Sequence, residues 1–220
     1  MKKILRVALL MLIVSRGWSG DIETTNTSLQ YLDKVVAIDC SKSIQNNLSS
    51  IADQSGVLFC TGTTPKSKER FYKPCLLKTK TAKISDFIKY LKDAGFCVWQ
   101  YESSILVCTP EMYSVAKELF EYEIKQFRFS GTYYDLFGAV GNMFPDNKTP
   151  SIVSSKSPDF LKKVNLEITS PMSTKDLLMK ATEKTRTTWR ICFRPEMINV
   201  KSELYSGSLL ILSCGSRAKK

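Results

Sequence analysis

No histidine occurs anywhere in the 220 residues of this chain. This absence excludes Ser-His-Asp and Cys-His hydrolysis, zinc binding through imidazole, and general acid–base catalysis by histidine. Any catalysis would have to rely on carboxylate, lysine or tyrosine side chains. The composition therefore favours a binding function, and we expect the protein not to be an enzyme.

Other chemical signatures are missing as well. A glycosidase needs two carboxyl groups that converge in one cleft. The acidic residues here, such as Asp86, Glu118 and Asp176, fall mainly on the outer faces of expected helices. The cysteines show no CxxC spacing, and there is no glycine-rich phosphate loop, helix-turn-helix pattern or RNP-like aromatic strand. We therefore expect no catalytic residues, no metal and no cofactor.

Long hydrophobic runs are also absent, since none reaches the roughly 20 residues that a membrane-spanning helix needs. The N-terminal run, residues 7–14, follows three basic residues and precedes Gly17 and Ser19, small residues at the positions that a signal peptidase reads. We expect residues 1–19 to be a cleaved signal peptide. The mature chain would then be periplasmic or secreted, without a membrane span. Retention of the segment as an anchor is the alternative.

What the sequence does have is an excess of positive charge. The formal net charge is +11, and removal of Lys2, Lys3, Arg6 and Arg16 with the signal peptide lowers it to +7. Such a charge favours polyanions, acidic proteins or anionic envelope surfaces as partners.

Residues 74–108 carry the clearest secondary-structure pattern. An extended run at 76–81 precedes a helix, for which we expect Ser85 as the N-cap and Gly95 as the left-handed end. Strands 96–101 and 104–108 follow as a hairpin. The apolar face of the helix consists of Ile84, Phe87, Ile88 and Leu91.

The preceding residues complete a small α+β unit. Residues 34–39 form an expected strand, and a helix capped by Ser41 or Ser43 ends at Gly56. A second strand at 57–61 leads through a loop into the region 74–108. The first half thus has the order β-α-β-β-α-β-β.

The same order returns after a helix that begins at Thr109-Pro110-Glu111. We expect an α+β fold of two tandem β-α-β-β-α-β-β modules, 31–109 and 125–215, joined by a connecting helix at 110–124. Residues 20–30 are an expected flexible N-terminus, and 216–220 form a basic tail. The segments KISDFIKYL and MSTKDLLMKA correspond, which favours an internal duplication. A coincidence of generic α+β patterns is the alternative.

The element order and the segment containing SDFIKYLKDAGFCVW resemble the secretin and TonB short N-terminal (STN) domain. Residues 34–108 carry the resemblance best, and 126–214 are similar to it as a more divergent second copy. The resemblance implies a periplasmic module that docks other proteins near an outer-membrane channel or receptor. No barrel-forming or secretin region follows here, so it implies a docking function for a tandem pair of modules.

Seven cysteines fit an oxidising compartment, in which disulfides support small sheets. The hairpin register favours a Cys97–Cys108 disulfide. Their positions also make Cys192–Cys214 and Cys60–Cys75 candidate pairs. Cys40 is then left over, and we expect it to be reduced and buried.

The loop before residue 74 mixes basic and aromatic residues, as surfaces that bind anionic polymers do. The corresponding loop of the second half is also basic, and we expect both loops to present positive charge on the same edge. A solvated loop without a binding role is the alternative. The candidate binding residues are Lys66, Lys68, Arg70, Phe71, Tyr72, Lys73, Lys156, Lys162 and Lys163.

From these patterns we expect an exported adaptor that docks onto an envelope or secretion-system protein. It would bind by strand addition at a sheet edge and through its basic loops. A secreted binder of an anionic envelope polymer, a cell-wall glycan or a nucleic acid, is the first alternative. A hydrolase that works without histidine is the second. The patterns leave the oligomeric state open.

Overall fold

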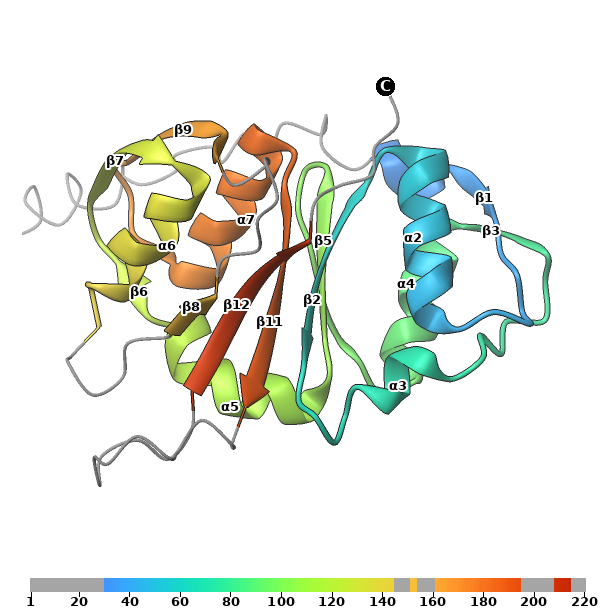
Figure 1. Cartoon of the computed structure of the whole chain (residues 1–220). Coiled ribbons are helices and arrows are strands. Elements are labelled where there is room, and N and C mark those ends of the chain that lie inside the picture. The colour runs from blue at the N-terminus through green and yellow to red at the C-terminus, as the bar shows by residue number, and fades with distance from the viewer. Residues whose placement is uncertain (1–29, 145–150, 154–160, 195–207, 215–220) are drawn as a thin grey trace, which may run out of the picture.

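The computed structural model describes residues 30–144, 151–153, 161–194 and 208–214, and it has the expected α+β class (Figure 1). The predicted signal peptide lies outside the described residues. The first half begins with a short 3-10 helix, η1 (Gln30–Asp33). Its further elements are β1 (Val35–Ala37), α2 (Ile44–Ser55), β2 (Leu58–Thr63), α3 (Glu69–Tyr72), β3 (Thr81–Lys83), α4 (Ile84–Asp93), β4 (Cys97–Gln100) and β5 (Ser104–Cys108).

The second half follows the helix α5 (Pro110–Phe120), which packs against strands of both halves. Its elements are β6 (Glu123–Ile124), β7 (Phe127–Thr132), α6 (Tyr133–Gly141), β8 (Ser151–Val153), β9 (Lys163–Ile168), β10 (Met172–Ser173), α7 (Thr174–Thr185), β11 (Thr188–Arg194) and β12 (Ser208–Cys214).

Most helix ends follow from the residues that stand there. The Ser43 side chain accepts a hydrogen bond from the Asn46 N–H at the start of α2, and Gly56 ends that helix with φ 77°. The Thr109 hydroxyl caps α5 in the same way, ahead of Pro110. The prediction of Ser85 as the cap of α4 is wrong, because the N-cap is Lys83, two residues earlier, and the helix begins at Ile84. The expected extended run at 76–81 is also shifted, to the short strand β3.

The strands of the two halves meet in one sheet. Six strands lie in the order β4-β5-β2-β11-β12-β8, so the first three come from the first half and the last three from the second. The junction is the parallel pair β2–β11, in which Thr61, Gly62 and Thr63 lie opposite Arg190, Ile191 and Cys192. The remaining strands form three separate pairs, β1–β3, β7–β9 and β6–β10. The two halves therefore share a continuous sheet rather than sitting side by side on a connecting helix.

Two hydrophobic cores lie on opposite faces of this sheet. The N-terminal core lies under α2 and α4, and the C-terminal core lies under α5, α6 and α7 (Figure 1). Strand β5 contributes to both: Ile105 and Val107 belong to the N-terminal core, and Leu106 and Cys108 to the C-terminal core. Because both faces of β5 are covered, all five of its residues are buried.

The hairpin register agrees with the prediction, but the structure does not contain the disulfide that was predicted from it. Cys97 lies opposite Cys108, and both are free thiols. The Tyr101 N–H donates to the Ser104 carbonyl, so by the alternation of an antiparallel ladder Cys97 and Cys108 form a hydrogen-bonded pair. Cβ atoms in such a pair are about 5.5 Å apart, farther than the about 3.8 Å of a disulfide.

The other two predicted cysteine pairs are contradicted by the fold. Cys192 lies opposite Leu210, whereas Cys214 lies opposite Thr188, at the other end of the strand pair. Cys60 belongs to the C-terminal core and Cys75 to the N-terminal core, so the sheet separates them. The two predictions failed because the spacing in the sequence shows neither the strand register nor the face of the sheet on which each cysteine lies.

Candidate functional site

A pocket of about 200 Å³ opens where the two halves of the sheet join. It lies over one face of the β2–β11 pair, against α3 and the first turn of α2. We call it the junction pocket. Its lining residues are Gln45, Thr61, Thr63, Thr64, Pro65, Lys68, Phe71, Tyr72, Arg190 and Cys192.

The position of the pocket follows from the strand pairing. In the parallel pair β2–β11, Thr61 lies opposite Arg190 and Thr63 lies opposite Cys192, so these four residues share one face of the sheet. Their neighbour Ile191 belongs to the C-terminal core on the other face. The junction pocket therefore forms on the face of the sheet that carries the helices of the first half.

Buried hydroxyl groups fix the loop that forms one wall of the pocket. Thr64 and Ser67 exchange backbone-to-side-chain hydrogen bonds, with N···O distances of 3.0 and 3.1 Å. The Ser67 hydroxyl also lies 2.7 Å from the hydroxyl of Thr109, the N-cap of α5. The Lys68 N–H then donates to the Thr64 carbonyl, which starts the turn of α3. Lys68 is thus presented by a fixed backbone.

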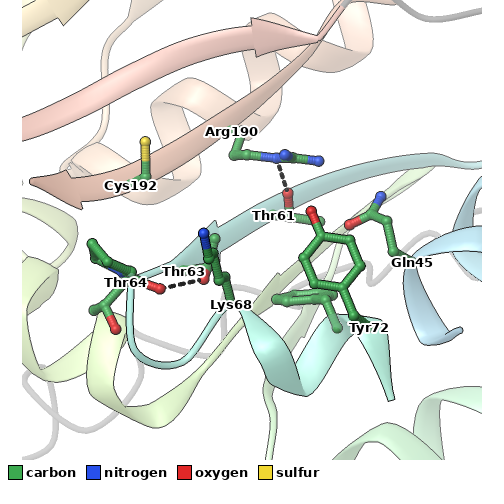
Figure 2. Close-up of a pocket in the computed structure, with 10 residues that line it drawn as sticks. Gln45, Thr61, Thr63, Thr64, Lys68, Tyr72, Arg190 and Cys192 are labelled. Carbon is green, nitrogen blue, oxygen red and sulfur yellow. Dashed lines mark hydrogen bonds between the residues drawn. The ribbon is translucent and has the colours of Figure 1, made fainter. Parts of the chain in front are cut away.

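The described residues that line the junction pocket include two cations and no carboxylate. Lys68 comes from the first half and Arg190 from the second. The Arg190 Nε donates to the Thr61 hydroxyl at 3.3 Å, which positions the guanidinium across the junction. Figure 2 shows Lys68 and Tyr72 pointing from α3 towards the side on which Arg190 lies. Gln45, Thr61 and Thr63 add amide and hydroxyl groups to this lining, which can form hydrogen bonds with an anionic group.

The structure brings together some of the predicted binding residues of the first loop. Lys68, Phe71 and Tyr72 line the junction pocket, although Phe71 is also part of the N-terminal core, with 3% of its surface exposed. Lys66 and Lys73 are exposed beside it and do not line it. Arg70 does not line it either, because its guanidinium pairs with the Glu111 carboxylate at 2.8 Å.

The predicted basic residues of the second half do not join this site. Lys156 lies outside the described residues. Lys162 and Lys163 stand at the start of β9, at the opposite end of the molecule from α3 (Figure 1). Lys162 and Lys163 therefore do not present their charge on the same edge as the basic loop of the first half.

Several lining residues of the junction pocket were not predicted from the sequence. They are Arg190, Gln45 and the threonines of β2. Arg190 is a basic residue within an otherwise mostly apolar strand, which is a weak signal by itself. Its importance depends on the pairing of β11 with β2, between residues 129 positions apart. No local pattern indicates that pairing.

Polar contacts beside the sheet also fasten α7 to the first half. The Tyr101 hydroxyl donates to the Asp176 carboxylate at 2.8 Å, and burial together with this carboxylate raises the pKa of Tyr101 far above its usual range. The Glu183 carboxylate accepts from the Ser104 hydroxyl at 2.9 Å. The half that carries Arg190 is thus held against the half that carries Lys68 by contacts outside the pocket.

Comparisons with protein families, with curated proteins and with solved structures find no match to this chain. Within the described part of the chain, no helix is long and apolar enough to cross a membrane. Over the same residues, no group of three or more cysteine, aspartate or glutamate side chains is placed to bind a metal ion. The geometry of the junction pocket is therefore the main basis for a functional proposal.

Proposed function

We propose that this protein is an exported, non-enzymatic docking protein whose junction pocket binds an acidic group of a partner protein of the envelope or of a secretion system. One observation carries the proposal. Lys68 and Arg190, one from each half, face the junction pocket, and none of the described residues that line it is acidic. Cations without a carboxylate beside them in a partly enclosed site favour an anionic ligand.

The size of the pocket favours a side group over a whole small molecule. Its volume of about 200 Å³ is below the roughly 300–1,000 Å³ that is usual for pockets of drug-sized ligands. A carboxylate side chain of a larger partner fits such a space, and Tyr72 at the rim, 60% exposed, offers an aromatic surface beside it. The pocket is therefore suited to anchoring one residue of a docked chain.

We further propose that the chain consists of two copies of one module similar to the STN domain. The strand pairings support this. In the first half β1–β3 and β4–β5 are antiparallel and β2–β5 is parallel. In the second half β7–β9 and β11–β12 are antiparallel and β8–β12 is parallel. The same three pairings thus recur in the same chain order.

Strand β4 supplies a second element of the proposed docking. It ends the six-stranded sheet, and its residues are all partly exposed. The alternation of the β4–β5 ladder directs the N–H groups of Val98 and Gln100 away from β5. A partner segment in extended conformation can pair with β4 through backbone hydrogen bonds. An acidic side chain of the same partner can then occupy the junction pocket.

The experiment is a titration of a fluorescein-labelled tetraglutamate peptide into the chain from residue 20 onwards. We expect Lys68→Met to weaken binding about 5- to 10-fold, because one charge-assisted contact at a partly exposed site is worth roughly 1–1.4 kcal/mol. Lys163→Met is the matched control, since it removes the same charge from an exposed position outside the pocket. It should leave the affinity unchanged within about 2-fold.

Equal losses in the two variants would contradict the pocket and indicate diffuse attraction to a basic surface. The alternative function is binding of an anionic envelope polymer. It is tested by the same titration with a single-stranded oligonucleotide and with an acidic polysaccharide. Exposed Lys66 and Lys73 beside the pocket favour that alternative. Polymer binding that falls about 100-fold or more between roughly 50 and 200 mM salt, with no binding of the peptide, would replace the docking proposal.

A further inference from the structure

Two cysteines of the first half lie on segments that the fold holds side by side. The segment after β1 carries Cys40, and the segment after α3 carries Cys75. The Cys75 N–H donates to the Lys42 carbonyl at 3.0 Å, and an isolated bridge joins Ser43 to Pro74. These backbone contacts fix the two segments relative to each other.

The two thiols converge on one residue. The Cys40 Sγ donates to the Leu77 carbonyl at 2.5 Å. Cys75 belongs to the N-terminal core, with 1% of its surface exposed, and Cys40 packs against that same core. Burial raises the pKa of the Cys75 thiol, and hydrogen bonds from the Leu77 backbone and the Tyr90 side chain oppose this shift. Each thiol thus contacts the backbone of Leu77, and both are free in the structure.

We propose that Cys40 and Cys75 form a disulfide when the protein meets an oxidant of the disulfide class, such as an oxidised thiol–disulfide oxidoreductase or glutathione disulfide. Cys40 is the more exposed of the two, so its thiolate attacks the oxidant first. This step forms a mixed disulfide and releases one thiolate of the oxidant. The Cys75 thiolate then attacks the Cys40 sulfur and releases the second thiol. Two protons and two electrons leave the protein, and the oxidant's disulfide is reduced.

This pair differs from those that the sequence suggested, because it joins neighbouring loops on one face of the sheet. The bond would close a loop that contains α2, β2 and α3. A cross-link across a loop of this length restricts the unfolded chain strongly. Since α3 presents Lys68 and Tyr72, the bond would also fasten the wall of the junction pocket. The inference itself rests on the positions of the two thiols and does not depend on the proposed function.

A non-reducing tryptic peptide map tests the proposal. The purified chain from residue 20 onwards is equilibrated with glutathione disulfide, its remaining thiols are alkylated, and the peptides are identified by mass spectrometry. We expect peptide 35–42, with Cys40, to be joined to peptide 71–78, with Cys75. We also expect the oxidised protein to melt roughly 5–15 °C higher than the reduced protein.

Two variants keep the test decisive. Cys40→Ser, at a partly exposed position, should fold but lose both the joined peptides and the redox dependence of the melting temperature. Cys60→Ser changes a cysteine of the other core and should keep both. The proposal is overturned if peptides 35–42 and 71–78 stay separate and alkylated. It is equally overturned if peptide 71–78 is joined to peptide 43–66, which carries Cys60.

Discussion

Substitution of Gly62 by alanine tests how tightly the two halves pack at their junction, and the measured quantity is the thermal stability of the protein. Gly62 lies in the middle of the β2–β11 pairing, opposite Ile191. A Cβ atom at this position would lie 2.4 Å from the Cys108 Sγ, 3.0 Å from the Ile191 Cγ2 and 3.2 Å from the Met112 Cγ. Cys108 and Met112 have no exposed surface, so neither can turn towards solvent to make room.

Overpacking of this kind lowers the free energy of unfolding by about 1–3 kcal/mol. Alanine offsets about 0.5 kcal/mol of this loss, because it restricts the unfolded chain more than glycine does. For a chain of this size we expect Gly62→Ala to lower the melting temperature by roughly 2–10 °C. Gly138→Ala is the matched control. Among the described residues, apart from the neighbouring backbone of α6 itself, no atom lies within 4 Å of a Cβ at Gly138, so this change should raise the melting temperature by roughly 1–4 °C.

Thermal unfolding followed by circular dichroism gives both values. A Gly62→Ala variant as stable as the wild type would refute the packing described at the junction. A further check is Cys108→Ala in the Gly62→Ala background, since removing the sulfur clears the shortest contact. The two changes together should then cost less than their sum by about 1 kcal/mol.

Three further predictions concern other parts of the structure. Ser43→Ala removes the side-chain cap of α2 and should lower the free energy of unfolding in urea by about 1 kcal/mol. Ser85→Ala should change it by less than about 0.5 kcal/mol, because Ser85 does not cap α4. Equal effects of the two variants would contradict the helix starts. Lys175 lies 5.5 Å from the Trp99 ring, so Lys175→Ala should cost about 1–2 kcal/mol and alter tryptophan fluorescence, and an unchanged emission spectrum would contradict the contact. Burial, and then Glu183, raise the pKa of Tyr31 to about 12. The stability from this group is complete below pH about 10 and is lost as the pH rises through about 12. Tyr31→Phe should therefore flatten the fall in stability in that range, and an unaltered slope in urea titrations would contradict the shift.

The local structure was predictable because it depends on short-range patterns. The apolar face of α4, Ile84, Phe87, Ile88 and Leu91, is fully buried, as its helical spacing predicts. Gly95 adopts φ 85°, the left-handed conformation expected of it. The hairpin register also followed from the two-residue turn, which leaves few ways to pair the strands.

The helix start at Ile84 shows the limit of such patterns. Ser85 is a common capping residue, but capping requires an extended backbone just before the first turn, and here Lys83 has that conformation. β3 ends at Lys83 and the helix follows at once, so the strand pairing with β1 determines where the helix begins. A tertiary contact therefore overrides the local preference.

The candidate site was predictable only in part. Lys68 and Tyr72 were recognisable because their loop mixes basic and aromatic residues. Arg190 was not, because it reaches the pocket only through the parallel pairing of β11 with β2. Parallel neighbours far apart in the chain carry no turn between them that could reveal their register. The prediction of a Cys60–Cys75 pair failed for a related reason, because the sequence does not show which core each side chain enters.

The affinity of the Arg190→Met variant for the labelled tetraglutamate peptide is the most direct test of the central claim, that both halves build one site for an acidic group. The account predicts a loss of about 5- to 10-fold, similar to that of Lys68→Met, with the far-ultraviolet circular dichroism spectrum unchanged. Unchanged affinity in Arg190→Met, alongside a clear loss in Lys68→Met, would show that the first half binds alone and would contradict a site shared across the junction.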